Sequence, residues 1–218
     1  MQPDFADSDI EKILKQINGA LVHGLHDFHD NPIIGGSYRE CAVAIQPDDV
    51  AEDPEKLKVL VEQRNGKNTF DTFIRAARKF YYTDSLSSMT AKERKIFKSM
   101  YHTCPPAKKV PQLMQKFAAD YRQKLKEGVE AFELAAWVHM TFVSIHPYED
   151  AMGREARILM NAELKRAGYL SVEFLDDKAY TKAIQRDHKH PGAFRDYLVE
   201  AYKHSPALNE VQDFPGPV

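Results

Sequence analysis

Apolar residues recur at the spacing of α-helices along most of the chain. A helix of about 18 residues is predicted from near residue 9, with Ser8 and Glu11 as its capping box, because apolar positions three and four apart form one face. These positions are Ile10, Ile13, Leu14, Ile17, Leu21 and Leu25. A second apolar face predicts a helix to about Lys126, ended by Gly128, with the members Leu113, Met114, Phe117, Ala118, Tyr121 and Leu125. Two more helices are predicted near 176–188 and 192–204.

A predicted strand precedes the segment from Gln46 to about Thr103, where the character of the chain changes. Residues 37–45, "SYRECAVAI", alternate in polarity, which predicts a strand or half of a hairpin. An acidic stretch, "QPDDVAEDPE", follows, and then three short amphipathic helices are predicted near 54–64, 69–82 and 90–101. Thr90 and Glu93 supply a capping box for the third of these helices.

Residues 129–145 are apolar on nearly every side, which is typical of a helix at the centre of a domain. His139 lies within this segment, and we expect it to be a core residue that makes a hydrogen bond. Pro147 disfavours the α conformation at His146, so the helix should end there. A turn follows, and a new helix is predicted from about Gly153 to Gly168.

The composition suits one packed domain, with or without an appended subdomain, and excludes several classes of protein. The 30 basic and 32 acidic residues are mixed along the chain, so no basic stripe marks a nucleic-acid partner. The N-terminal residues lack the features of a signal peptide, and no apolar run is long enough for a membrane span. We expect a cytoplasmic protein, or an effector secreted by a signal-less route. Cys41 and Cys104 are too few for a disulfide framework, although they could pair with each other.

Candidate chemistry gathers between residues 146 and 157, "HPYEDAMGREAR". The first backbone amides of the helix predicted from about Gly153 lack partners within the helix and form a site for an anion. Arg154 and Arg157 add positive charge, and Asp150 can hold Mg²⁺ that bridges phosphate oxygens. Histidine titrates near neutrality, so His146 could take a proton from a hydroxyl. This pattern indicates phosphotransfer or nucleotidyl transfer.

The same stretch resembles the Fic (Fic/Doc) signature H-P-F-x-D/E-G-N-G-R-x-x-R. "GGSYRECAVAI", "PPAKKVPQLM" and "FLDDKAYTKAI" are similar to the segment that opens the family's β-hairpin flap, the segment after the flap and the C-terminal helix. The resemblance implies an all-α Fic fold, a helical bundle with a small β-hairpin flap and a helical insertion. It implies a single Fic domain over 1–218, made of the following parts: N-terminal helix and flap strand (9–45), insertion (46–104), core helices (105–204) and tail (205–218).

The resemblance also implies an activity, the transfer of AMP from Mg·ATP to a Ser, Thr or Tyr hydroxyl of a target protein. His146 would be the general base and Asp150 the Mg²⁺ ligand. The nucleotide phosphates would be bound by residues at the start of the helix predicted from about Gly153: Ala151, Met152, Gly153, Arg154 and Arg157. The flap would hold the target as an added strand, through Tyr38, Arg39, Ala42, Val43 and Ala44. Fic domains commonly pair, so a homodimer is possible.

Two positions depart from the family pattern. Ala151 replaces the first glycine of G-N-G, which is tolerable if the backbone there needs no positive φ. Met152 replaces the asparagine, and a thioether cannot donate a hydrogen bond to phosphate. One such lost bond is worth roughly 1.5–3 kcal/mol, so activity would be weakened or redirected.

Three alternatives therefore stay open at this point. The group transferred could instead be UMP, phosphocholine or phosphate, or the domain could be a silent module that binds nucleotide or a protein. Arg157 could pair with Glu155 or Glu163 rather than with phosphate. The insertion could select the target or cover it. The family's inhibitory S/T-x-x-x-E-G/N motif has no full match here, so inhibition within the chain is not expected.

Overall fold

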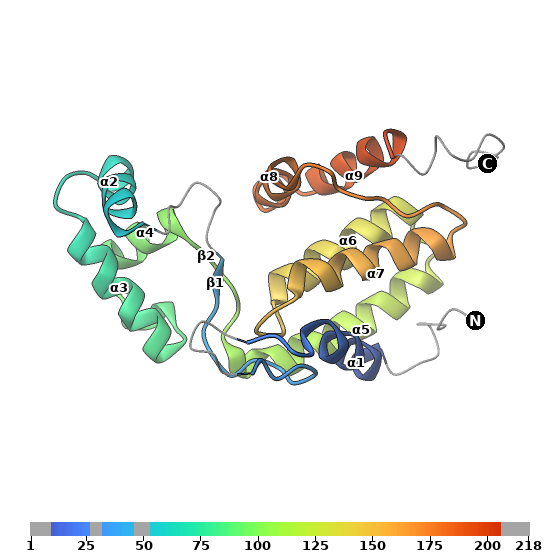
Figure 1. Cartoon of the computed structure of the whole chain (residues 1–218), viewed down its shortest axis with the longest axis horizontal. Coiled ribbons are helices and arrows are strands. Elements are labelled where there is room, and N and C mark those ends of the chain that lie inside the picture. Colours follow the sequence, from blue (N-terminus) through green and yellow to red (C-terminus); the bar gives the residue numbers. More distant parts are fainter. Residues whose placement is uncertain (1–9, 27–31, 46–52, 206–218) are drawn as a thin grey trace. The chain divides into compact units, whose positions relative to one another are not determined.

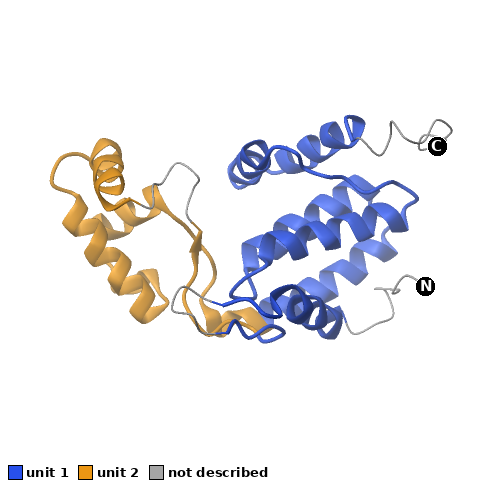
Figure 2. Cartoon of the chain, viewed as in Figure 1, with its two compact units in different colours: residues 1–37, 112–218 blue, residues 38–111 orange. Residues whose placement is uncertain are grey.

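The computed structural model describes residues 10–26, 32–45 and 53–205, and over these residues the chain is mostly helical with one small antiparallel sheet (Figure 1). The chain divides into two compact units (Figure 2). Unit 1 contains residues 1–37 and 112–218, and unit 2 contains residues 38–111. The second unit thus groups the predicted flap strand with the predicted insertion. The single Fic domain over 1–218 stays a prediction.

Unit 1 is built from helices whose positions follow the apolar pattern. They are α1 (Ile10–Val22), α5 (Val110–Lys126), which begins at the boundary with unit 2, α6 (Ala131–Ile145), α7 (Met152–Arg166), α8 (Asp177–Asp187) and α9 (Ala193–Lys203). Helix α1 has 13 residues, fewer than predicted. The predicted cap residue Ser8 lies outside the described residues. Gly168, with a φ of 88°, follows α7 as predicted.

Helix α6 is the centre of unit 1, as its uniformly apolar sequence predicts. Ten of its residues are buried: Phe132, Leu134, Ala135, Ala136, Val138, His139, Met140, Phe142, Val143 and Ile145. It packs most extensively against α7 and also against α9, and α1 packs against α7. No helix among the described residues has both the length and the apolar character needed to cross a bilayer.

Unit 2 contains the three predicted helices of the insertion, α2 (Pro54–Asn65), α3 (Phe70–Thr83) and α4 (Ala91–Met100), and the 3₁₀ turns η1 (Leu86–Ser88) and η2 (Ala107–Lys109). The predicted capping box is present, because the Thr90 side chain accepts from the Glu93 N–H and the Glu93 carboxylate accepts from the Thr90 N–H. The helices enclose a core of their own, which includes Val61, Phe73, Ala76, Phe80, Ile96, Phe97 and Met100.

The flap strand is much shorter than the sequence pattern predicts. Strand β1 (Ala44–Ile45) pairs with β2 (His102–Thr103), with Ala44 opposite Thr103 and Ile45 opposite His102. The residues before β1 satisfy their carbonyls differently. The buried Arg39 guanidinium donates to the carbonyls of Cys41 and Pro105, at 2.6 and 2.5 Å. The Cys41 carbonyl before β1 is thus bound by a side chain, and the same guanidinium also binds Pro105 after β2. Cys41 and Cys104 are free thiols, so the pairing considered above does not form.

Candidate active site

His146 lies where the sequence predicts, immediately after α6. Its N–H donates to the Phe142 carbonyl at 3.0 Å, which closes the last turn of the helix. Its backbone is left-handed, with φ 51° and ψ 64°. This conformation is rare for a residue with a Cβ, and it avoids the α region that the following proline disfavours. The chain therefore leaves the helix axis at His146, and the imidazole stands at the start of the loop.

Ala151 also has a left-handed backbone, with φ 69° and ψ 9°, and it precedes α7 as the N-cap residue. Alanine would be a neutral replacement for glycine only without a positive φ, so this position favours glycine. A Cβ in this region costs roughly 1–2 kcal/mol because it approaches the following carbonyl oxygen. Two left-handed residues thus bracket the loop from His146 to Ala151, which we call the 146–151 loop.

The Asp150 carboxylate lies at the N-terminus of α7 and is about half exposed. Its Oδ1 accepts a hydrogen bond from the Ala151 N–H and lies 3.8 Å from Nη2 of Arg154. The Ala151 amide is therefore directed at Asp150, while the later amides of the first turn face no intrahelical acceptor. Within the described residues Oδ2 of Asp150 makes no hydrogen bond.

These contacts fit a magnesium ion held by few protein atoms. One carboxylate oxygen is oriented and the other is available, in an exposed position beside an anion-binding helix terminus. The described part of the chain holds no group of three or more His, Cys, Asp or Glu side chains arranged for a metal. Such a cage is not needed, because Mg²⁺ takes one or two carboxylates and completes its shell with water and substrate oxygens.

The two arginines in the first two turns of α7, Arg154 and Arg157, have different neighbours. Nη1 of Arg154 donates to the Leu21 carbonyl near the end of α1, at 3.4 Å. The Arg157 guanidinium carbon lies 5.3 Å from the centre of the Tyr180 ring on α8. Neither ion pair that the alternative reading of Arg157 requires is found within the described residues. Glu163 instead accepts from the Tyr121 hydroxyl, at 2.6 Å, and from Arg166, at 3.0 Å.

A buried hydrogen bond supports Tyr180 from the side of α6. The ring nitrogen Nε2 of His139 lies 2.8 Å from the Tyr180 hydroxyl, and the imidazole stacks on Phe194 at 4.2 Å. Burial, and next the charge of Arg157, lower the pKa of His139 to about 3, so the ring stays neutral. The prediction that His139 is a hydrogen-bonded core residue is confirmed. Arg157 thus rests on a ring that the core holds in place.

Asn18 on α1 holds the 146–151 loop, and the sequence analysis did not identify it. Its Nδ2 donates to the Asp150 carbonyl at 3.1 Å, and its Oδ1 accepts from the Gly36 N–H at 3.0 Å. The side chain is almost completely buried. A signal was present in the sequence, since Asn18 continues the row of every fourth residue that buries Ile10, Leu14 and Val22. One polar residue in a buried row needs partners.

Glu155 lies beneath the loop on the first turn of α7 and is fully buried. Burial raises its pKa from the ordinary 4.5 to about 8, and the neighbouring Asn18 amide opposes this effect. The side chain is therefore a neutral acid near pH 7. A neutral Glu155 therefore adds no negative charge to the first turn of α7.

Met152 and Gly153 begin α7, and their side-chain positions differ. The Met152 side chain is 5% exposed, so it packs into the interior rather than standing free at the helix terminus. A Cβ on Gly153 would come within 3.6 Å of Nη1 of Arg157 and 3.9 Å of the Tyr180 hydroxyl, which are ordinary contacts. Glycine at 153 therefore leaves open space beside the Arg157 guanidinium.

The predicted flap residues all lie in unit 2. Arg39 and Ala42 are buried, so their side chains serve the fold of that unit and only their backbones could meet a target. Val43 accepts from the Cys104 N–H at 3.0 Å, which extends the pairing beyond β1 by one bond. Tyr38 and Ala44 are half-buried.

Comparison with known proteins identifies this arrangement. Residues 83–164 match the Fic/DOC family. The chain contains a Fic/DOC family domain. The match begins at the end of α3, so it takes in α4, which the sequence analysis assigned to the insertion. The 146–151 loop, Arg154 and Arg157 lie inside it.

Two solved Fic structures share the fold. A Fic domain-containing signalling protein from Bacteroides thetaiotaomicron superposes with a TM-score of 0.60 at 18% identity, over 91% of this chain and 60% of the other. A Fic family protein from Desulfovibrio desulfuricans gives 0.57 at 19% identity, over 98% of this chain and 50% of the other. The prediction of a mostly helical Fic fold with a small hairpin is confirmed.

Curated relatives match a smaller part of the chain. Protein adenylyltransferase Fic of Drosophila persimilis is 37% identical over 68 residues, which is 31% of this chain and 13% of the relative. Protein adenylyltransferase Fic of Nematostella vectensis is 34% identical over 87 residues, which is 39% of this chain and 20% of the relative. The match thus spans one fifth or less of each of these relatives.

Proposed function

We propose that this Fic protein transfers AMP from Mg·ATP to a Ser, Thr or Tyr hydroxyl of a target protein. The observation that carries the proposal is the 146–151 loop. It joins a histidine at the end of one buried helix to a carboxylate and two arginines at the start of the next, and Asn18 holds it in place. A base, an Mg²⁺ ligand and an anion site on one loop suit the transfer of a phosphate-linked group.

In the proposed reaction the His146 imidazole takes the proton of the target hydroxyl. The hydroxyl oxygen forms a bond to the α-phosphorus of ATP, and the bond from that phosphorus to the oxygen of the β-phosphate breaks. Pyrophosphate leaves, and AMP stays on the target. The amides of Met152 and Gly153, with the Arg154 and Arg157 side chains, would neutralise charge on the phosphates.

Asp150 would hold the magnesium ion, which supplies positive charge next to the phosphate oxygens. Oδ1 of Asp150 accepts from the Ala151 N–H, and Oδ2 would be the oxygen that binds the ion. The fixed carboxylate also positions Arg154, whose guanidinium lies 3.8 Å away.

A second candidate function is favoured by one observation. Met152 occupies the position of the family's asparagine, and its side chain is buried. It therefore gives the phosphates neither a hydrogen bond nor a polar surface. The same loop could transfer a different group, such as UMP, phosphocholine or phosphate, or it could bind nucleotide without transfer.

Two radiolabelled nucleotides separate these functions. Protein labelling is measured with α-³²P-ATP and with γ-³²P-ATP, beside His146→Ala. Label from the α position alone, lost in His146→Ala, is expected. Label from the γ position would indicate phosphate transfer. No label from either, with ATP bound, would indicate a silent module. UTP and CDP-choline, tested in parallel, cover the remaining groups.

Met152→Asn tests the departure from the family pattern. It is expected to increase AMP transfer by about 10-fold, since one hydrogen bond to a charged phosphate is worth roughly 1.5–3 kcal/mol. The free energy of unfolding must be measured beside the rate, because the side chain is buried. A rate that is unchanged in a folded variant would contradict the assigned role of this position.

A further inference from the structure

Helix α3 in unit 2 presents a groove lined by basic side chains, none of which has been assigned a role so far. The groove has a volume of about 590 Å³ and runs along one face of the helix. We call it the basic groove and define it by Arg75, Arg78, Lys79 and Tyr82. Asp71 supplies its single carboxylate. Tyr82 is 88% exposed, so its ring is accessible to a partner at this groove.

The charge of this part of the chain differs from that of the whole. Residues 54–100 contain 11 Lys and Arg against 5 Asp and Glu, a net charge of +6, whereas the chain carries −2. The rest of the sequence therefore carries −8. Two of the five acids are bound within the unit. Glu93 is buried, and the Asp84 carboxylate accepts from the Ala107 N–H. Residues 54–100 are therefore locally basic, although the stretch directly before them, residues 46–53, adds four acidic residues.

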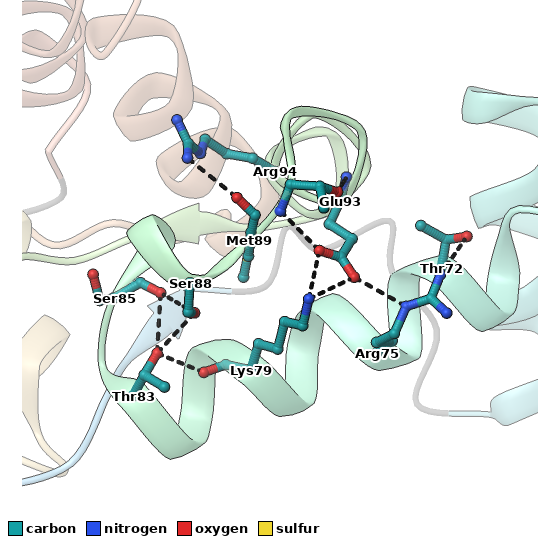
Figure 3. Close-up of polar contacts among 10 residues, drawn as sticks. Thr72, Arg75, Lys79, Thr83, Ser85, Ser88, Met89, Glu93 and Arg94 are labelled. Atoms are coloured by element: carbon teal, nitrogen blue, oxygen red, sulfur yellow. Dashed lines mark hydrogen bonds and ion pairs between the residues drawn. The ribbon is translucent and has the colours of Figure 1, made fainter.

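Buried Glu93 fixes two cations of the groove (Figure 3). Its Oε1 accepts from Nε of Arg75 at 2.9 Å, and its Oε2 accepts from Nζ of Lys79 at 2.8 Å and from the Thr90 N–H at 2.8 Å. These bonds, with that from Lys79 the largest cause, lower the pKa of Glu93 to about 2, so the anchor stays ionised.

The anchored cations keep their outer faces toward solvent. The Arg75 side chain is 61% exposed and Lys79 is 36% exposed, while Glu93 is 4% exposed. One carboxylate is shared by two cations, so a positive charge remains. Arg78 adds a further exposed charge, and it forms no ion pair with any described residue. Side chains held in place before binding lose less conformational freedom when a partner arrives.

The size of the groove indicates the kind of partner. From residue 75 to residue 82 a helix rises only about 10 Å, at 1.5 Å per residue. Three cations beside an aspartate suit a few carboxylates, whereas binding to a nucleic-acid backbone draws on a longer track of phosphate contacts. An exposed tyrosine adds apolar contact of the kind found at protein interfaces.

The groove and the predicted flap lie in the same unit, which indicates that the partner of the groove is the target protein. Helix α4, which anchors the groove through Glu93, is followed within two residues by β2, the partner of β1. In the described part of the chain β1 pairs with β2 alone. We infer that the basic groove docks an acidic segment of the target protein. This inference rests on the proposed function, because it names the target as a protein with exposed acidic residues.

Peptide binding tests the inference apart from catalysis. The probe is a fluorescein-labelled 16-residue peptide of Asp, Glu and two Leu, measured by anisotropy without nucleotide in 50 mM salt. An Asn/Gln version and a 16-nucleotide oligothymidine are the comparison probes. The proteins are wild type, Arg78→Glu, Tyr82→Ala and Arg122→Glu. Arg122 on α5 is exposed and unpaired among the described residues, so its reversal is a matched control.

Arg78→Glu is expected to weaken binding of the acidic peptide about 10-fold and Tyr82→Ala about 3-fold, with less than 2-fold for Arg122→Glu. His146→Ala should bind the peptide as wild type does, so loss of AMP transfer would not disturb the result. Equal weakening by Arg78→Glu and Arg122→Glu would overturn the inference, as would no binding of the peptide. Tighter binding of the oligothymidine would replace the protein partner by nucleic acid. Circular dichroism checks that each variant is folded.

Discussion

Glu155 gives a pH dependence whose size follows from its burial. Its pKa is about 8 in the folded chain and 4.5 when the side chain is in water. Between these values the folded protein binds more protons than the unfolded protein, so stability falls as pH rises through this window. The interval of about 3.5 pH units corresponds to at most about 5 kcal/mol, at about 1.4 kcal/mol per unit.

Glu155→Gln removes the titrating group and keeps the shape of the side chain. Urea unfolding at pH 4 to 9 gives the difference in free energy of unfolding between the variant and wild type. This difference is expected to shift in favour of the variant by up to about 5 kcal/mol between pH 4.5 and pH 8, and to level off above pH 8. Glu173→Gln, at an exposed position, is the control. A difference that does not change with pH would refute the neutral, buried carboxyl.

The remaining predictions concern the supports of the 146–151 loop. Asn18→Ala removes two buried hydrogen bonds and should lower the free energy of unfolding by about 2–4 kcal/mol in urea; a loss below 1 kcal/mol would contradict its role. Ala151→Gly removes the strain of a left-handed alanine. It should raise the free energy of unfolding by up to about 1 kcal/mol after the entropy of glycine is subtracted, and a lower melting temperature would count against strain. Tyr180→Phe keeps the ring under Arg157 but loses the hydroxyl, which bonds to His139 and also interacts with Arg157, so it should cost about 1–2 kcal/mol of stability and leave ATP affinity within 2-fold if the ring is the main support. Tyr180→Ala removes the ring and should weaken ATP binding several-fold by calorimetry; equal affinity in both variants would exclude the ring as a support.

The helices could be predicted because their cause is local. Apolar spacing placed α2 to α9 within a few residues, and Pro147 predicted the end of α6. The capping box of Thr90 and Glu93 also formed as expected. Each of these features depends on residues close together in the sequence, so periodicity and backbone sterics were sufficient.

The supports of the site could not be predicted in the same way. Asn18 meets Asp150 across 132 residues of sequence, and His139 meets Tyr180 across 41. No local pattern specifies such partners. The strand predicted over 37–45 is reduced to Ala44–Ile45, and the Cys41 carbonyl before it is bound by the Arg39 side chain, a contact that the alternating pattern does not reveal. The positive φ of Ala151 was missed because alanine rarely adopts it.

Ile45 and His102 face each other across the small sheet, so the residues that flank the segment 46–101 are neighbours. The helices between them enclose their own core, to which the flanking chain contributes Ala42. A hairpin turn of two residues can join strands that are paired in this way. The segment is therefore a structural insert that could be exchanged without separating the two paired strands. Under the proposed function, exchange of this segment would change the part of unit 2 that the target meets, whereas the 146–151 loop belongs to unit 1.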